Sequence, residues 1–300
     1  EAQNALRPDL MIVVMSATLD AEPVARMLGD APVITSDGRA FDVQTHWLDR
    51  PVPKTTRFEN SATDLVINAV NATTGGVLVF LPGEGEIRRT EQLLGGALPA
   101  DCRIMPLYGS MDFRAQRAAI APLASWRKIV LATSIAETSL TIEDIRVVVD
   151  CGRARRARFD PGAGMSRLVT ERVTKAEAHQ RRGRAGRVAQ GHCYRLWTKG
   201  EEGGMAPFPP PEIEAADLSG LVLELALWGA TGIQAIEEMA FLTLPNPGAF
   251  GRAQDLLRTL GALDVAGAIT PQGRKLAAIP LHPRLGHMLL QGGESAALLA

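Results

Sequence analysis

The sequence predicts an α/β protein with a parallel sheet covered by helices on both faces, followed by a small, mainly helical domain. Up to about residue 205, short apolar runs alternate with longer amphipathic stretches, a pattern typical of parallel strands joined by helices. The proline-rich residues 205–211 then favour a stiff linker, because proline fixes one backbone angle and removes a hydrogen-bond donor. We therefore expect two folded regions that meet at this linker.

Six apolar runs are the expected strands of the sheet. The middle runs are apolar throughout, as strands covered on both faces should be. The runs are residues 10–15, 76–81, 104–107, 128–132, 145–149 and 192–196. The helices expected between them, several of which begin at Asp or Thr caps, are residues 21–28, 64–72, 84–94, 112–121 and 174–186.

The region after the linker is predicted to form helices followed by a short hairpin, which suggests a winged-helix unit. Its expected elements are helices at residues 217–228 and 250–260, an extended segment at 263–269, a turn at 271–273 and a further helical stretch. We expect Trp228 and Phe250 in the core of this unit rather than as platforms on which bases stack.

Length and composition exclude several classes of protein. The 300 residues suffice for about two domains, and a chain with 46% hydrophobic and 22% charged residues should fold. No apolar run reaches about 18 residues and no signal-like N-terminus occurs, so we expect no membrane insertion or secretion and predict a cytoplasmic location. The three cysteines form no Cys-x-x-Cys pair, which argues against a disulfide framework or a zinc site.

Charge is distributed unevenly along the chain, although the net charge is only −1. Residues 151–187 contain eleven basic residues against three acidic ones, whereas residues 200–251 contain eight acidic residues and no Lys or Arg. An excess of eight positive charges suits a partner that carries phosphates. A solvated charged face is the alternative interpretation of the same run.

Three short segments match one set of motifs. Ser16-Ala17-Thr18 follows the first apolar run, residues 132–142 follow a middle run, and residues 180–187 lie in the arginine-rich segment. The second reads A-T-S-I-A-E-T-S-L-T-I and the third Q-R-R-G-R-A-G-R. Together they resemble motifs III, V and VI of superfamily 2 helicases, in the form of the DEAH-box (DEAH/RHA) branch, and the wider pattern is similar to its bacterial HrpB-type members.

The resemblance implies a RecA-like fold and an order of domains. It covers nearly the whole chain, yet no G-x-x-x-x-G-K-[S/T] loop and no Asp-Glu-Ala-His sequence occur in it. We therefore expect a C-terminal fragment, cut short at both ends, with most of the first RecA-like domain ahead of Glu1. The expected parts are residues 1–45 (tail of the first RecA-like domain and linker), 46–205 (second RecA-like domain), 206–280 (winged helix) and 281–300 (start of a helical domain).

The resemblance implies hydrolysis of ATP, and arginine suits that reaction. Catalysis depends on positive charge placed where the phosphate oxygens become more negative in the transition state. Arg184 and Arg187, three residues apart on one helical face, can both reach one phosphate. By resemblance they are arginine fingers, and Gln180 orients the attacking water. Arg181 and Arg182 point elsewhere on the helix and are expected in interdomain contacts.

Further contacts to ATP and RNA follow from the resemblance. Motif V would touch the RNA backbone at Thr133 and lie near the ribose at Thr141 and Glu143, while Ser134 replaces the usual Asn. The other expected nucleotide contacts are Ser16, Thr18 and Gly183. Ser16 and Thr18 fit equally well as caps of the helix that begins near Ala21.

Two segments are expected to contact RNA in addition to motif V. Gly109 and Ser110 form a turn that resembles a backbone-binding turn, where the missing side chain of Gly109 lets a phosphate approach. Residues 155–170 predict a β-hairpin around a glycine-bearing loop, with Arg156 and Arg158 on one face as expected RNA contacts. The family has a strand-dividing hairpin here, although plain sheet decoration is the alternative.

Three hypotheses of function follow. The first is a fragment of an ATP-dependent RNA helicase, inactive alone, with ATP and Mg²⁺ bound between this module and the first RecA-like domain and with single-stranded or partly duplex RNA as partner. The second is a DNA-directed translocase of the same superfamily, and the third is a non-catalytic nucleic-acid-binding module. Gln180, Arg184 and Arg187 argue against the third, because a pure binder needs no water-orienting amide beside two phosphate-directed arginines.

Overall fold

The computed structural model describes residues 7–15, 21–35, 41–123, 125–137, 142–160, 162–239 and 241–292. The chain divides into two compact units, Glu1–Ser36 and Asp37–Ala300. No helix in this described part of the chain combines the length and apolarity needed to cross a bilayer.

The first unit contains the predicted helix, α2 (Ala21–Met27), but the strand predicted at residues 10–15 is wrong. Those residues form no regular element, and Met11 and Met15 are 83% and 87% exposed. An apolar run becomes a strand only where another strand satisfies its backbone groups. The described residues of this unit include no strand that could do so.

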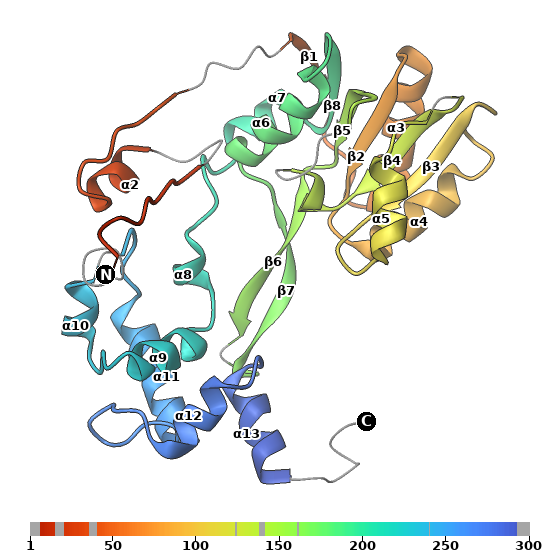
Figure 1. Ribbon diagram of the computed structural model, residues 1–300. Helices are drawn as coiled ribbons and strands as arrows, with labels where there is room; N and C mark the ends of the chain where they lie inside the picture. The colour runs from red at the N-terminus through yellow and green to blue at the C-terminus, as the bar shows by residue number, and fades with distance from the viewer. Residues whose placement is uncertain are drawn as a thin grey trace. The chain divides into compact units, whose positions relative to one another are not determined.

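The second unit is built on a six-stranded parallel sheet with strand order β1-β8-β5-β2-β4-β3 (Figure 1). Its strands are β1 (Val43–Leu48), β2 (Gly76–Phe80), β3 (Cys102–Leu107), β4 (Arg127–Ala132), β5 (Ile145–Asp150) and β8 (Gly191–Thr198). Five of the six match apolar runs, which confirms the predicted fold class. Edge strand β1 was missed, because only Val43 of its residues is fully buried and no apolar run marks it.

Helices cover both faces of the sheet, as predicted. On one face α3 (Phe58–Ala72) and α4 (Glu84–Leu94) pack through residues such as Val66 and Ile87. Helix α3 begins earlier than the predicted residue 64, because Phe58 packs against this core and extends the helix. On the other face, α5 (Phe113–Ile120) contributes Ala119 to a second core. Burial of each large side chain stabilises the fold by about 1.5–3 kcal/mol.

A separate antiparallel hairpin follows β5, as predicted. It consists of β6 (Arg153–Asp160) and β7 (Met165–Arg172), and Figure 1 shows it projecting from the larger sheet. The chain then forms α6 (Lys175–Gly183) and a 3-10 turn, η2 (Arg184–Gly186), before entering β8 and α7 (Lys199–Gly203). These segments bring the arginine-rich part of the sequence onto and beside the sheet.

The proline-rich linker is irregular, as predicted, and it contacts α6. The backbone N–H groups of Lys175 and Ala176 donate to the carbonyls of Ala206 and Pro207, at 2.9 and 3.0 Å. The first turn of a helix has no internal partners for its N–H groups, so these bonds satisfy two of them. The linker is thereby fixed to the start of α6.

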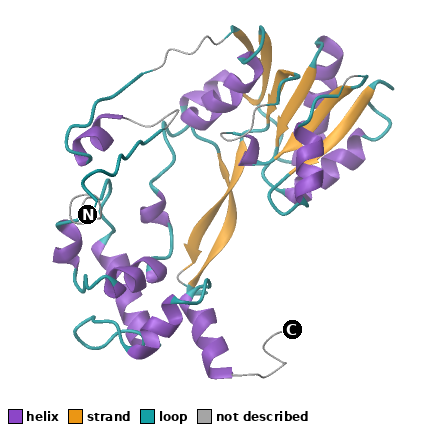
Figure 2. Cartoon of the chain, in the orientation of Figure 1, coloured by secondary structure: helices purple, strands orange, loops and turns teal. Residues whose placement is uncertain are grey.

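The winged-helix region that follows is mainly helical (Figure 2). Its helices are α8 (Glu212–Ala215), α9 (Ser219–Leu227), α10 (Ile233–Glu237), α11 (Pro247–Thr259) and α12 (Pro271–Ala277), and α13 (Pro283–Gly292) comes after it. Leu263 and Ile269 form an antiparallel bridge at the predicted hairpin. Phe250 is in the core, as predicted.

Two predictions for this region are wrong. Trp228 is 73% exposed, because it stands at the C-cap of α9, just before Gly229 with φ +92° turns the chain away. Residues 271–273 start helix α12 instead of forming a turn. Thr270 caps that helix by accepting from Gly273 N at 3.0 Å, and proline is well tolerated at the first helical position.

Candidate nucleotide and RNA site

The α6–η2 segment carries the predicted catalytic residues. Thr174 caps α6 in a capping box, in which its hydroxyl accepts from Glu177 N and the Glu177 carboxylate accepts from Thr174 N at 2.7 Å. The helix runs through half-buried Gln180 and tightens to a 3-10 turn at Arg184. Residues three apart lie on one side of a 3-10 turn, so Arg184 and Arg187 stay close together.

Arg184 is buried, whereas Arg187 is exposed. The guanidinium of Arg184 donates to the backbone carbonyl of Glu137 in motif V. Burial, followed by repulsion from Arg187, lowers the pKa of Arg184 to about 10. Arg184 therefore remains charged at neutral pH, in a place where two cations crowd each other and an anion would relieve the repulsion.

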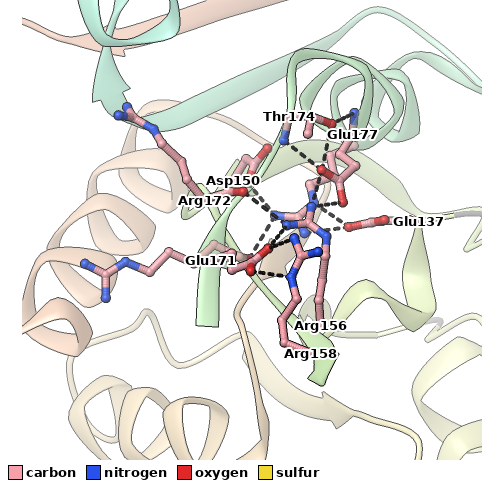
Figure 3. Close-up of polar contacts among 10 residues, drawn as sticks. Glu137, Asp150, Arg156, Arg158, Glu171, Arg172, Thr174 and Glu177 are labelled. Atoms are coloured by element: carbon pink, nitrogen blue, oxygen red, sulfur yellow. Dashed lines mark hydrogen bonds and ion pairs between the residues drawn. The ribbon is translucent and has the colours of Figure 1, made fainter. Parts of the chain in front are cut away.

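Arg181 is 1% exposed and is held by two carboxylates (partners in Figure 3). Its Nε donates to Glu137 at 2.7 Å and its Nη1 donates to Asp150 at 2.8 Å. Burial alone would lower the pKa of Arg181, but Asp150 and Glu137 together raise it above its usual value. This guanidinium is a structural cation at the centre of the domain.

The interdomain role expected for Arg181 is therefore wrong, because its side chain is 1% exposed, whereas that of the half-buried Arg182 stays a prediction. Arg181 faces the sheet, and Arg182 donates to Thr45 Oγ1 at 3.0 Å and to the Val43 carbonyl at 2.7 Å, both on β1. The helix packs over β5 and β1, and Lys175 and His179 lie on its exposed side.

Glu137 joins motifs V and VI and was missed by the sequence reasoning. Its side chain pairs with Arg181 and its carbonyl accepts from Arg184. Burial raises the pKa of the Glu137 carboxyl, an effect that Arg181 partly offsets. The signal in the sequence was an acidic residue inside motif V, and for Asp150 an acidic residue directly after an apolar run.

The predicted RNA contacts of β3 and β4 lie together. Thr133 follows β4, and its N–H donates to the carbonyl of Leu107, the last residue of β3, at 3.2 Å. Gly109 and Ser110 follow Leu107 after one residue, Tyr108, and are exposed. The hydroxyl of Ser110 donates to Glu84 at 3.2 Å. The structure thus brings Gly109, Ser110 and Thr133 to one edge of the sheet.

The hairpin arginines are paired with glutamates (Figure 3). Arg158 donates to both oxygens of Glu171, at 2.6 and 2.7 Å. Arg156 donates to Glu171 at 3.0 Å and to both oxygens of Glu177 at 2.5 Å. Arg156 and Arg158 share one face, as predicted, and their role as RNA contacts stays a prediction.

The remaining predicted nucleotide contacts are more scattered. Glu143 is exposed in the turn before β5, and Gly183 is exposed at the end of α6. Ser16, Thr18 and Thr141 lie outside the described residues. Within the described ranges, no three or more His, Cys, Asp or Glu side chains are grouped so as to hold a metal ion.

Comparison with known families identifies two parts of the chain. Residues 61–189 match the family described as helicase conserved C-terminal domain. Residues 253–281 match the winged-helix part of the helicase associated domain, HA2. The two matches fall in the α/β region and in the helical region after the linker, respectively.

Individual relatives are similar over nearly the whole chain. It is 43% identical over 291 residues to the ATP-dependent RNA helicase HrpB of Escherichia coli (strain K12), covering 97% of this chain and 35% of the relative. It is 36% identical over 298 residues to the pre-mRNA-splicing factor ATP-dependent RNA helicase prp22 of Schizosaccharomyces pombe, covering 96% and 25%. A crystal structure of the Escherichia coli DEAH/RHA helicase HrpB matches with a TM-score of 0.89 at 42% identity, covering 97% of this chain and 36% of that one. The chain thus spans about a third or less of the length of these relatives.

Proposed function

The chain belongs to the DEAH/RHA family of helicases, and we propose that it supplies the arginine-finger half of the ATPase site and part of the RNA channel of an ATP-dependent RNA helicase. One observation carries the proposal. The motif VI arginines are fixed to motif V, since Glu137 accepts from Arg184 through its carbonyl and from Arg181 through its carboxylate. The two motifs are therefore held together as one rigid unit that could contact ATP.

ATP fits the residues at this place. Arg184 and Arg187 would contact the terminal phosphate, and the half-buried amide of Gln180 would orient the attacking water. Burial lowers the pKa of Arg184 most, and the repulsion from Arg187 that adds to this effect supports an anionic ligand there. Glu143 and Gly183 would lie along the nucleotide, and Ser16, Thr18 and Thr141 complete the proposed set. We place the magnesium ligands on the first RecA-like domain.

RNA would cross the edge of the sheet at Gly109, Ser110 and Thr133. Exposed backbone at Gly109 and the Thr133 hydroxyl suit phosphate oxygens, which accept hydrogen bonds, and the Ser110 hydroxyl would exchange Glu84 for such an oxygen. Two relatives that are similar over nearly the whole chain are described as RNA helicases, which favours RNA over DNA.

The domain boundaries belong to the same proposal. From the sequence we assign residues 46–205 to the second RecA-like domain, 206–280 to the winged helix, 1–45 to the tail of the first RecA-like domain and linker, and 281–300 to the start of a helical domain. The first boundary lies at residue 43 or earlier, because β1 pairs with β8 in the sheet of the second domain. The matches to residues 61–189 and 253–281 support the two central assignments. A cytoplasmic location stays a prediction of the sequence.

The test is nucleotide hydrolysis and duplex unwinding by the full-length protein. We expect ATPase activity that rises with single-stranded RNA and less with DNA of equal length, because contacts to the 2′-hydroxyl separate the two polymers. The 300-residue chain alone should hydrolyse no ATP above background, because it contains no phosphate-binding loop. Robust turnover by the chain alone would contradict the proposed division of the site, and equal stimulation by DNA would favour a DNA-directed translocase.

A further inference from the structure

We propose that Glu177 is a positioning residue. Its ion pair with Arg156 fixes the motif VI helix to the base of the hairpin, so that RNA bound by the hairpin changes the positions of the ATPase groups on and after that helix. The inference rests on the proposed function. It gives Arg156 a role inside the protein in place of direct contact with RNA.

The Arg156–Glu177 ion pair, drawn in Figure 3, is mostly sheltered from solvent. Nη2 of Arg156 lies 2.5 Å from each carboxylate oxygen of Glu177, and the two side chains are 18% and 14% exposed. Exposed ion pairs contribute little because water competes with them, whereas a sheltered, charge-assisted hydrogen bond is stronger. The two terminal nitrogens of Arg156 bind different carboxylates, Nη1 that of Glu171 on β7 and Nη2 that of Glu177 on α6. The pair can therefore hold β6 and α6 in one relative position.

A second contact lies one helical turn further along α6. Nη1 of Arg181 donates to the backbone carbonyl of Arg153, the first residue of β6, at 3.3 Å. Between the two contacts, Ala154 of β6 and Ala178 of α6 share a small buried core. Two polar contacts with an apolar one between them prevent the helix from pivoting on the hairpin.

A shift at the hairpin base would therefore reach the ATPase groups. Gln180 is three residues after Glu177 on the same short helix, and Arg184 follows α6 directly. Helices move as rigid elements, and a misplacement of about 1 Å at a catalytic group can lower a rate by about 10²-fold. Arg156 thus connects the RNA-facing element with the element that carries the catalytic groups.

The capping box alone does not explain this pair. Helix α7 begins with the same box, Thr198 with Glu201, and there the nearest arginine, Arg172, is 3.7 Å away and 47% exposed. A Thr–Glu box can therefore form without a close arginine. Glutamine also closes a capping box, so Glu177→Gln keeps the cap and removes only the charge that Arg156 binds.

A double-mutant cycle in the full-length protein tests the inference. The variants are Glu177→Gln, Arg156→Gln and the double variant, and the readouts are kcat without RNA, kcat with saturating single-stranded RNA, RNA Kd and the unfolding temperature. We expect RNA stimulation of kcat to fall on the order of tenfold in all three variants, with the double variant no worse than either single one. Glu177→Gln should leave kcat without RNA unchanged.

Arg167→Gln is the matched control. Arg167 is also on the hairpin and pairs with Asp160 at 3.2 Å, but both partners lie within the hairpin, so stimulation should be kept. If Arg156→Gln weakens RNA binding while Glu177→Gln has no effect, Arg156 is an RNA contact and the inference is wrong. A parallel fall of both kcat values and the unfolding temperature would reduce Glu177 to a structural residue and overturn it as well. If RNA does not stimulate the ATPase activity of the unmodified full-length protein, the proposed function is refuted, and the inference with it.

Discussion

The hairpin and the α6–η2 segment are adjacent in sequence and both rich in arginine, yet their arginines have different surroundings. Arg158 of the hairpin is 28% exposed and pairs with one glutamate on the neighbouring strand. Arg181 of α6 is 1% exposed and pairs with Asp150 and Glu137 from two distant segments. Arg184 is buried as well, but its contact in motif V is a backbone carbonyl.

This difference shows that residue type and charge density do not assign a role to an arginine. A guanidinium with two buried carboxylates is a structural cation, and one with a single exposed carboxylate can exchange its partner for a phosphate. Two crowded guanidinium groups, as at Arg184 and Arg187, gain from an anionic ligand. Four predictions test this comparison, beginning with the largest expected effect.

Shortening the hairpin should abolish unwinding in the full-length protein. The change replaces residues 161–164 and the rungs next to them with a two-residue turn, which removes the part that would divide the strands. RNA-stimulated ATPase activity should largely survive, because Thr133, Gln180 and Arg184 lie outside the deleted part. The ion pair between Arg156 and Glu177 is also kept. Unwinding assays and ATPase assays on the same preparation provide the measurement. Unwinding at the parental rate would mean that the hairpin is only decoration.

Removing a proposed arginine finger should mainly affect turnover. Arg184→Ala or Arg187→Ala is expected to lower kcat on the order of 10³-fold or more, while nucleotide affinity stays comparatively intact, because the charge acts on the transition state. Steady-state kinetics and nucleotide binding measured in parallel separate the two quantities. Equal losses in both would indicate that these arginines bind ground-state ATP.

Replacing the buried arginine should mainly affect stability. Arg181→Met leaves the carboxylates of Asp150 and Glu137 without their cation and is expected to lower the free energy of unfolding by about 3–5 kcal/mol. Arg158→Met, which breaks a partly exposed pair, should lower it by no more than about 1 kcal/mol. Urea denaturation of both variants makes the comparison, and similar losses would show that burial does not separate the two regions.

Acid should affect the two regions differently. The Arg158 guanidinium lowers the pKa of Glu171 to about 2, so the stabilisation from this pair is present above the ordinary glutamate range and is lost as pH falls toward 2. Burial raises the pKa of Glu137, so that carboxyl should take up a proton at a higher pH than an ordinary glutamate. Carboxyl NMR titrations of both side chains provide the test. A common midpoint would remove the distinction between the regions.

Much of the sheet and of the candidate site was predictable from local signals. Apolar runs marked β2, β3, β4, β5 and β8, because strands buried on both faces have few polar residues. The motif spacing also placed Gln180, Arg184 and Arg187 on one continuous segment, as the structure has them. The comparisons confirm the family that these motifs indicated.

Tertiary contacts decided what local signals could not. The apolar residues 10–15 form no strand, whereas the half-polar β1 does, because a strand depends on a partner elsewhere in the chain and β8 provides one for β1. The roles of the arginines are non-local in the same way. Arg181 meets Asp150 and Glu137 across 31 and 44 residues of sequence, and Arg156 meets Glu177 across 21. By itself the sequence determined the motifs and the strands that are covered on both faces. Only the folded chain determined the edge strand and the carboxylate with which each arginine pairs, because the Coulomb energy of a pair depends on distance and burial in space.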